Sequence, residues 1–145
     1  MKKKLACTAA AALFLACFAG CVGGNTNIEP TELADQLVDE FKIEGLAAVG
    51  EEAARERYGL ITGVPGEGVE AFDIREGDEG KETRLLAIVK AKGKEEAQKA
   101  EEQLRAAAGK LGLAGVRFER SGSYVFAADG GFAEQMAEEF LRLTH

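Results

Sequence analysis

The sequence predicts an α+β domain in which two leading helices precede a ββαββα unit. Several segments show the 3.6-residue spacing of amphipathic helices, one segment is apolar throughout its centre, and two short segments alternate between apolar and polar residues. Moving the first strand to the end would give the ferredoxin-like order. We therefore expect a four-stranded, largely antiparallel sheet in a permuted ferredoxin-like order. A right-handed crossover should place both later helices on one face.

The two leading helices are expected at residues 30–44 and 46–59. In the first, Pro30 is followed by acidic residues, as at many helix starts. Its apolar residues share one helical face: Leu33, Leu37, Val38 and Phe41. Gly59 should end the second helix. Residues 62–68, TGVPGEG, are expected to form a loop because of their Gly and Pro content.

The next three elements are two strands and the clearest helix. Residues 69–75 alternate in polarity. Residues 83–91 are nearly all apolar at their centre, which predicts an interior strand that is covered on both faces. Residues 94–113 predict a helix whose buried stripe is mostly alanine, so it can pack close to a sheet.

A hairpin and a final helix complete the domain. Residues 116–119 alternate as a half-buried strand does, a turn follows at Ser121 and Gly122, and residues 124–128 return as a second strand. The segment 130–143 predicts a closing helix with one apolar side: Phe132, Met136, Phe140 and Leu143.

The first 20 residues have the layout of a secretory signal. Three lysines precede the uncharged segment 5–18, which is shorter than the ~20 apolar residues of a membrane span. The sequence Phe18-Ala19-Gly20-Cys21 resembles the bacterial lipobox, in which the cysteine thiol receives a diacylglyceryl group and cleavage occurs just before it. We expect cleavage between Gly20 and Cys21 and lipidation of Cys21. The alternative is an ordinary signal with a chance cysteine.

A lipidated Cys21 would fix where the domain resides. Two acyl chains hold a protein stably on a bilayer, whereas one holds it marginally. Residues 21–31 would then form a flexible tether, and residues 32–145 a single domain. The expected location is the outer face of the plasma membrane.

Composition limits the chemistry of this domain. Without residues 1–20 the chain has 15 Lys and Arg against 25 Asp and Glu, a net charge of −10. This acidity argues against nucleic acid as a partner. The single histidine is His145, and no cysteine follows Cys21, so no Ser-His-Asp, Cys-His or zinc site can be assembled. We expect no catalytic residue, no metal and no cofactor.

The hairpin tip is the first candidate for binding. It holds the only serines after residue 20, together with an arginine and a tyrosine: Arg120, Ser121, Ser123 and Tyr124. The alternative is ordinary turn chemistry. Tyr58 and Gly59 form a second candidate, an aromatic platform beside a binding groove. The alternative interpretation is a ring at the edge of the core, followed by a glycine that caps the helix.

Acidic and glycine-rich segments give weaker candidates. One cluster of acidic residues could bind calcium; the alternative is a hairpin whose charges are exposed to water. The cluster is Asp73, Glu76, Asp78 and Glu79. Four pairs of adjacent glutamates could supply the two acids of a glycosidase; the alternative is that they form the charged outer surface of helices. The pairs are Glu51-Glu52, Glu95-Glu96, Glu101-Glu102 and Glu138-Glu139. The GVPGEG segment lacks the following helix that a phosphate-binding loop needs.

Three segments together resemble a known family. ERYGL, RLLAIVKAKGKEEAQKAEEQL and RSGSYVFAAD, followed by an amphipathic terminal helix, are similar to the small bacterial lipoproteins known as domain of unknown function 4358. The resemblance covers residues 33–143 and implies a location and an architecture. It implies no activity and no catalytic residues.

These expectations favour a non-enzymatic binding or interaction module on the membrane, with an envelope protein or a small ligand as its partner. One alternative is a carboxylate-dependent cell-envelope hydrolase, which needs two acids roughly 5 to 10 Å apart in a cleft. Another is an accessory subunit of an envelope complex.

Overall fold

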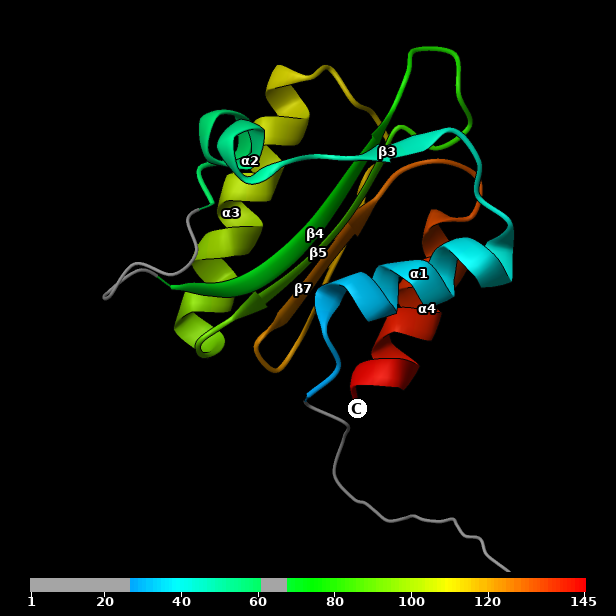
Figure 1. Ribbon diagram of the computed structural model, residues 1–145. Helices are drawn as coiled ribbons and strands as arrows, with labels where there is room; N and C mark the ends of the chain where they lie inside the picture. The colour runs from blue at the N-terminus through cyan, green and yellow to red at the C-terminus, as the bar shows by residue number, and fades with distance from the viewer. Residues whose placement is uncertain (1–26, 61–67) are drawn as a thin grey trace, which may run out of the picture.

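The computed structural model describes residues 27–60 and 68–145. Four helices and one five-stranded antiparallel sheet make up this part, so the α+β class is confirmed (Figure 1). The strands lie in the order β3-β4-β5-β7-β6. The elements along the chain are α1 (Pro30–Phe41), β3 (Leu46–Ala48), α2 (Glu51–Tyr58), β4 (Val69–Gly77), β5 (Leu85–Ala91), α3 (Lys94–Lys110), β6 (Arg117–Ser121), β7 (Tyr124–Ala128) and α4 (Ala133–Thr144).

The expected count of four strands is wrong because residues 46–48 form a strand rather than the start of a helix. This strand, β3, pairs with β4, with Leu46 opposite Gly77. The main-chain N–H of Val49 then donates to the carbonyl of Ile74 at 2.8 Å, and α2 begins only after Gly50. Alanine favours helices by a fraction of a kcal/mol, which hydrogen bonds along an open sheet edge can override.

The expected placement of both later helices on one face is also wrong. Helices α2 and α3 cover one face of the sheet, and α1 and α4 cover the other (Figure 1). The crossover rule constrains only a helix that joins two parallel strands of a sheet. Because α4 follows the last strand, it is free to pack on the face opposite α3. The permuted ferredoxin-like arrangement therefore does not describe this domain.

The interior strand β5 supplies side chains to both layers, as expected. Ala87 and Val89 point into the cluster beneath α2 and α3, whereas Leu86 and Ile88 point into the cluster beneath α1 and α4. The five residues 85–89 are all fully buried. Among the described residues, helices pack on both faces of the sheet, so neither face is wholly open to a partner.

The packed chain begins before residue 32. Ile28 is buried, its carbonyl accepts a hydrogen bond from the hydroxyl of Tyr124 at 2.8 Å, and Pro30 starts α1. The expected signal segment, Gly20 and Cys21 lie outside the described residues, as does most of the expected loop 62–68. Within the described ranges, no helix is both long enough and apolar enough to cross a membrane.

Candidate functional site

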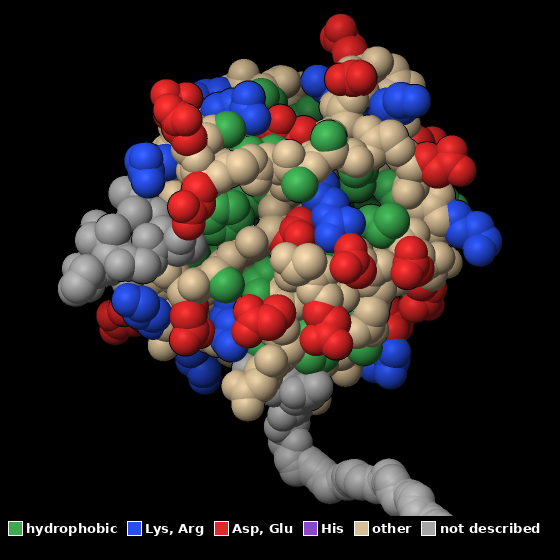
Figure 2. Space-filling model, in the orientation of Figure 1, with side chains coloured by type: hydrophobic (Ala, Val, Ile, Leu, Met, Phe, Trp, Pro, Cys, Tyr) green, Lys and Arg blue, Asp and Glu red, His purple; other side chains and the backbone are tan. Residues whose placement is uncertain are grey.

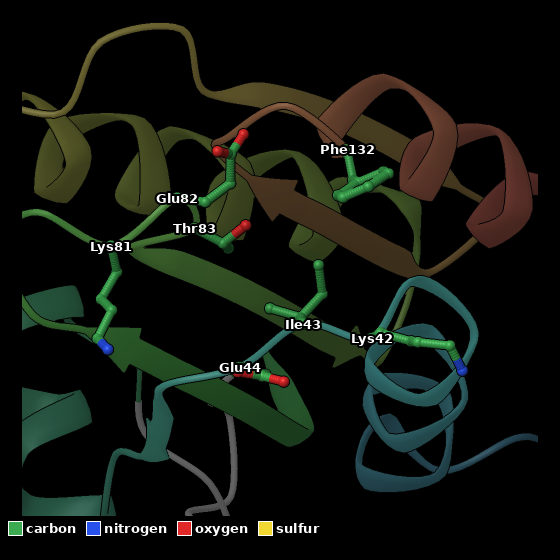
Figure 3. A pocket seen from close by; sticks show the side chains of 7 residues that line it. All are labelled: Lys42, Ile43, Glu44, Lys81, Glu82, Thr83 and Phe132. Carbon is green, nitrogen blue, oxygen red and sulfur yellow. The ribbon is translucent and has the colours of Figure 1, made fainter.

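A hollow of about 250 Å³ lies where three segments meet. These are the residues that follow α1, the connection between β4 and β5, and the start of α4 (Figure 3). The lining side chains combine an aromatic ring, an aliphatic chain, a hydroxyl and four charges: Lys42, Ile43, Glu44, Lys81, Glu82, Thr83 and Phe132.

Two local features of the backbone shape the hollow. Helix α1 ends at Phe41, and its C-cap residue Lys42 has a left-handed φ of 53° that turns the chain away from the helix axis. On the opposite side, Gly130 has a φ of 97° and lies against the β4–β5 connection. A Cβ atom at Gly130 would come within 2.6 Å of the carbonyl oxygen of Glu82, so only glycine permits this approach.

Hydrogen bonds hold the floor of the hollow in place. The buried carboxylate of Asp129 accepts the main-chain N–H groups of Arg84 at 2.7 Å and Leu85 at 2.9 Å. Glu82 accepts the N–H of Gly131 at 2.6 Å. The start of α4 is thereby fastened to the residues on either side of Thr83.

Thr83 presents an unsatisfied polar group. Its side chain is only 1% exposed, and its hydroxyl has no hydrogen-bond partner among the described residues. Figure 3 shows this hydroxyl directed toward the space between Glu82, Ile43 and Phe132. A buried hydroxyl without a partner costs about 1–3 kcal/mol, so a water molecule or a ligand that paired with it would be stabilised here.

Phe132 supplies an apolar wall. We expected it on the buried side of the terminal helix, but it precedes α4 as its N-cap residue and is 41% exposed. Met136 and Phe140 are buried as expected, Leu143 is half-buried, and the helix also buries Ala133. The ring of Phe132 lies 5.7 Å from that of Phe41, which restricts its orientation without covering it.

The expected tip residues lie at the β6–β7 turn, at the other end of the molecule. Arg120 is exposed and forms an ion pair with Glu101 at 2.8 Å. Gly122, with a φ of 60°, and the half-buried Ser123 form the turn.

The remaining two tip residues face inward. Ser121 is buried, and its hydroxyl lies 3.4 Å from the carbonyl of Thr144. Tyr124 is buried and donates to the carbonyl of Ile28. These two side chains therefore fasten the ends of the chain and do not form an exposed surface with Arg120.

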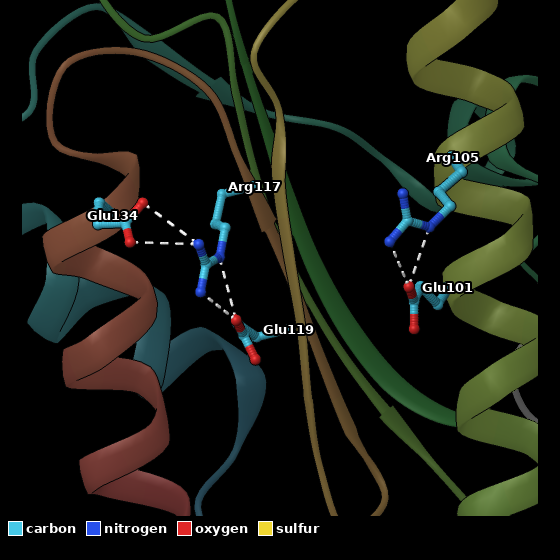
Figure 4. Close-up of polar contacts among 5 residues, drawn as sticks. All are labelled: Glu101, Arg105, Arg117, Glu119 and Glu134. Atoms are coloured by element: carbon cyan, nitrogen blue, oxygen red, sulfur yellow. Dashed lines mark hydrogen bonds and ion pairs between the residues drawn. The ribbon is translucent and has the colours of Figure 1, made fainter.

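Ion pairs lie on and near the edge strand β6 (Figure 4). Arg117 donates to Glu119 at 3.0 Å and to Glu134 at 3.2 Å. On α3, Arg105 donates to Glu101 at 2.9 Å. Charged side chains along an edge strand discourage pairing with another chain. Figure 2 likewise shows acidic and basic side chains interspersed over the visible face.

Tyr58 is a buried ring at the edge of the core. It is 2% exposed, and its hydroxyl donates to Glu76 at 2.5 Å. Gly59 follows it as the left-handed C-cap of α2, as expected. Burial, the hydrogen bond to Glu76 and the negative charge of Glu76 raise the pKa of Tyr58 far above its usual value. These contacts agree with the core-edge interpretation rather than with an exposed platform.

We expect this tyrosine to make the protein less stable in alkali. In the unfolded chain Tyr58 loses its proton near pH 10, whereas in the folded chain it keeps the proton to higher pH. The contribution of Tyr58 to the free energy of unfolding is thus fully present below about pH 10. Above that pH it declines by up to about 1.4 kcal/mol per pH unit. Urea unfolding between about pH 8 and pH 11 measures this slope.

Two matched variants separate the contributions of Tyr58 and Tyr124 to this pH dependence. The Tyr58→Phe variant should show a shallower decline than the wild type. Tyr124→Phe serves as the comparison, because burial also raises the pKa of Tyr124. Equal slopes in the wild type and in Tyr58→Phe would contradict the assignment.

The expected acidic group does not come together. On β4, Asp73 pairs with Arg75 at 2.8 Å, and Arg75 continues to Asp35 of α1. Glu76 points to the opposite face, toward Tyr58. In the described part of the chain, no three His, Cys, Asp or Glu side chains are placed to hold a metal ion.

Two acids are found near each of two depressions. Glu44 and Glu82 line the hollow, and Glu82 is already held by the N–H of Gly131. Glu51 and Glu70 line a second depression of about 310 Å³ beside β4. Of the adjacent glutamate pairs, only Glu51 belongs to these linings, so the pairs lie on helix surfaces rather than facing one another.

The sequence did not single out the hollow. Its side chains come from three distant segments, and no spacing along the chain relates Glu44, Thr83 and Phe132. The one local signal was the Gly130-Gly131 pair directly before an aromatic residue and a helix.

Comparisons with models of protein families, with curated proteins and with solved structures gave no match to this chain. The resemblance to the domain of unknown function 4358 lipoproteins therefore stays a prediction.

Proposed function

We propose that this protein is a lipid-anchored, extracytoplasmic binding domain, and that it is a member of the domain of unknown function 4358 lipoproteins. The observation that carries the binding role is the unpartnered, buried hydroxyl of Thr83 in a hollow beside the exposed ring of Phe132. The lipobox-like sequence that ends at Cys21 supports the anchor.

The position of the hollow supports this role. The described chain begins beside Tyr124, just before α1, and the residues that follow the end of this helix line the hollow. The 12 residues of α1 separate these two points by about 18 Å. A tether attached at the first point would leave the hollow accessible on the side away from the lipid.

The side chains of the hollow favour binding over catalysis. A hydroxyl nucleophile needs a general base within hydrogen-bonding distance. The hydroxyl of Thr83 has no such neighbour in the described part of the chain. Glu82, the acid next to it in sequence, is held by the N–H of Gly131. We therefore propose that the domain recognises a ligand without converting it.

The anchor is tested by replacing Cys21. We expect Cys21→Ala to abolish incorporation of a fatty-acid analogue and to release the protein from the membrane fraction, because cleavage and acylation both require this thiol. Cys17→Ala is the matched control, since Cys17 lies within the expected signal and should be dispensable.

Two results would contradict the proposal. One is continued labelling and membrane retention of Cys21→Ala. The other is turnover of an envelope substrate that is lost when Glu44 or Glu82 is changed to glutamine, which would indicate the hydrolase alternative.

A further inference from the structure

We propose that the hollow binds a small zwitterion with an apolar side chain, the chemistry of a free amino acid. The inference rests on the proposed binding role and names the class of ligand. Small-molecule sites usually measure about 300–1,000 Å³. The hollow measures about 250 Å³, just below this range, which favours a small ligand.

One half of the hollow suits an apolar group. Phe132 is 41% exposed, and Ile43 lies near it across the hollow (Figure 3). The contact with Phe41 holds the ring of Phe132 at a fixed tilt, so little conformational freedom is lost when a ligand packs against it. Burying an aliphatic or aromatic side chain there removes apolar surface of both partners from water.

The other half offers charges of both signs. Neither Lys81 nor Glu44 takes part in an ion pair with another described residue. The aliphatic part of Lys81 lies against Gly45, where a Cβ atom would come within 3.0 Å of it. The exposed side chain of Lys81 therefore lies beside the residue that follows Glu44. A carboxylate can pair with Lys81, and an ammonium group can pair with Glu44.

Thr83 lies between the two halves and can complete the recognition. Its hydroxyl can donate to a carboxylate or accept from an ammonium group. Satisfying this buried hydroxyl adds to affinity because the unliganded protein leaves it unpaired. Figure 3 shows Lys42 extending away from the hollow, so Lys81 is the lysine that we assign to the ligand.

The arrangement of charge disfavours ligands that carry only one sign. A simple anion would meet Glu44 and Glu82, whereas a simple cation would meet Lys81 and the positive end of the α4 dipole. A zwitterion places each of its charges beside the opposite one.

Calorimetric titration of the full-length protein, purified from whichever cell fraction contains it, tests the ligand class. L-leucine and L-phenylalanine should bind and raise the Tm. Phenylpropionate lacks the ammonium group, phenylethylamine lacks the carboxylate, and glycine lacks the apolar chain. Each of these three should bind at least about 10-fold more weakly, the equivalent of one lost charged or apolar contact.

Single substitutions locate the site. Phe132→Ala, Lys81→Gln and Thr83→Val should each reduce the affinity about 5- to 10-fold or more. Leu111→Ala is the matched control, because Leu111 is 38% exposed and does not line the hollow. The unliganded Thr83→Val protein should have a Tm equal to or above that of the wild type, since the substitution removes an unpaired buried hydroxyl.

Three outcomes would overturn the inference: no binding of either amino acid at millimolar concentration, equal binding of a singly charged analogue, or unchanged affinity in Phe132→Ala and Lys81→Gln. None of them bears on the anchor, because labelling at Cys21 does not depend on the hollow. Failure of the inference and failure of the anchor are therefore separate results.

Discussion

Replacing Phe126 with alanine is expected to lower the free energy of unfolding by about 3–5 kcal/mol. Phe126 lies on β7, is fully buried, and stacks on Phe140 of α4 with ring centroids 5.3 Å apart. Truncation removes this contact and leaves a cavity between the sheet and the helices α1 and α4. Since small domains have only about 5–15 kcal/mol of stability, this one change should remove a large part of it.

Urea unfolding measures the effect, and Phe132→Ala is the control for loss of a phenyl ring. Because Phe132 is largely exposed, its truncation should cost less than about 1 kcal/mol. A cost below about 1 kcal/mol for Phe126→Ala would mean that α4 does not pack on this face of the sheet. It would contradict the placement of α3 and α4 on opposite faces.

Replacing Asp129 with alanine is expected to cost about 3 kcal/mol and to disturb the hollow. The carboxylate of Asp129 is the acceptor for two main-chain N–H groups, those of Arg84 and Leu85. Hydrogen bonds to charged groups each contribute about 1.5–3 kcal/mol, and removing the acceptor leaves both donors in a largely buried environment. The same bonds hold Thr83 against the start of α4.

Asp129→Asn keeps the size of the side chain and one acceptor oxygen, so it should cost less than Asp129→Ala. Denaturant unfolding gives the two free energies, and hydrogen exchange at Arg84 and Leu85 reports the local effect. If exchange at these two amides is as slow in Asp129→Ala as in the wild type, the carboxylate does not fasten this segment.

Local patterns predicted those elements whose boundaries are set by neighbouring residues. Strand β7 was expected at residues 124–128 and lies there, because a glycine turn precedes it and its apolar run is short. Strand β5 was expected in the interior because its centre is uniformly apolar, and both of its faces are covered. The helix α3 begins at Lys94 as expected and ends at Lys110, ahead of Gly112 with its left-handed φ of 72°.

Contacts between segments that are distant in the sequence were not predictable in the same way. The periodicity of α4 shows that one side is apolar, but it does not say which face of the sheet that side covers. Strand β3 depends on the open edge of β4, which the sequence of residues 46–48 does not reveal. The hollow depends on the placement of α4, because Phe132 reaches it only when α4 packs on the same face as α1.

The chemistry of the hollow was hidden for a second reason. Thr83 was read as part of a strand, Lys81 as part of a polar turn and Glu44 as the end of a helix, each of which is an ordinary setting for its residue type. The close approach of Gly130 to Glu82 and the hydrogen bonds of Asp129 together bring the start of α4 over Thr83. The hairpin tip, which stood out by composition, instead holds two side chains that fasten the ends of the chain.

The proposed lipid anchor is tested most directly by the intact mass of the protein isolated from bacterial membranes. We predict a mature chain that begins at Cys21 and carries a diacylglyceryl group on its sulfur. A chain that retains residues 1–20, or one that begins at Cys21 with an unmodified thiol, would contradict the assignment.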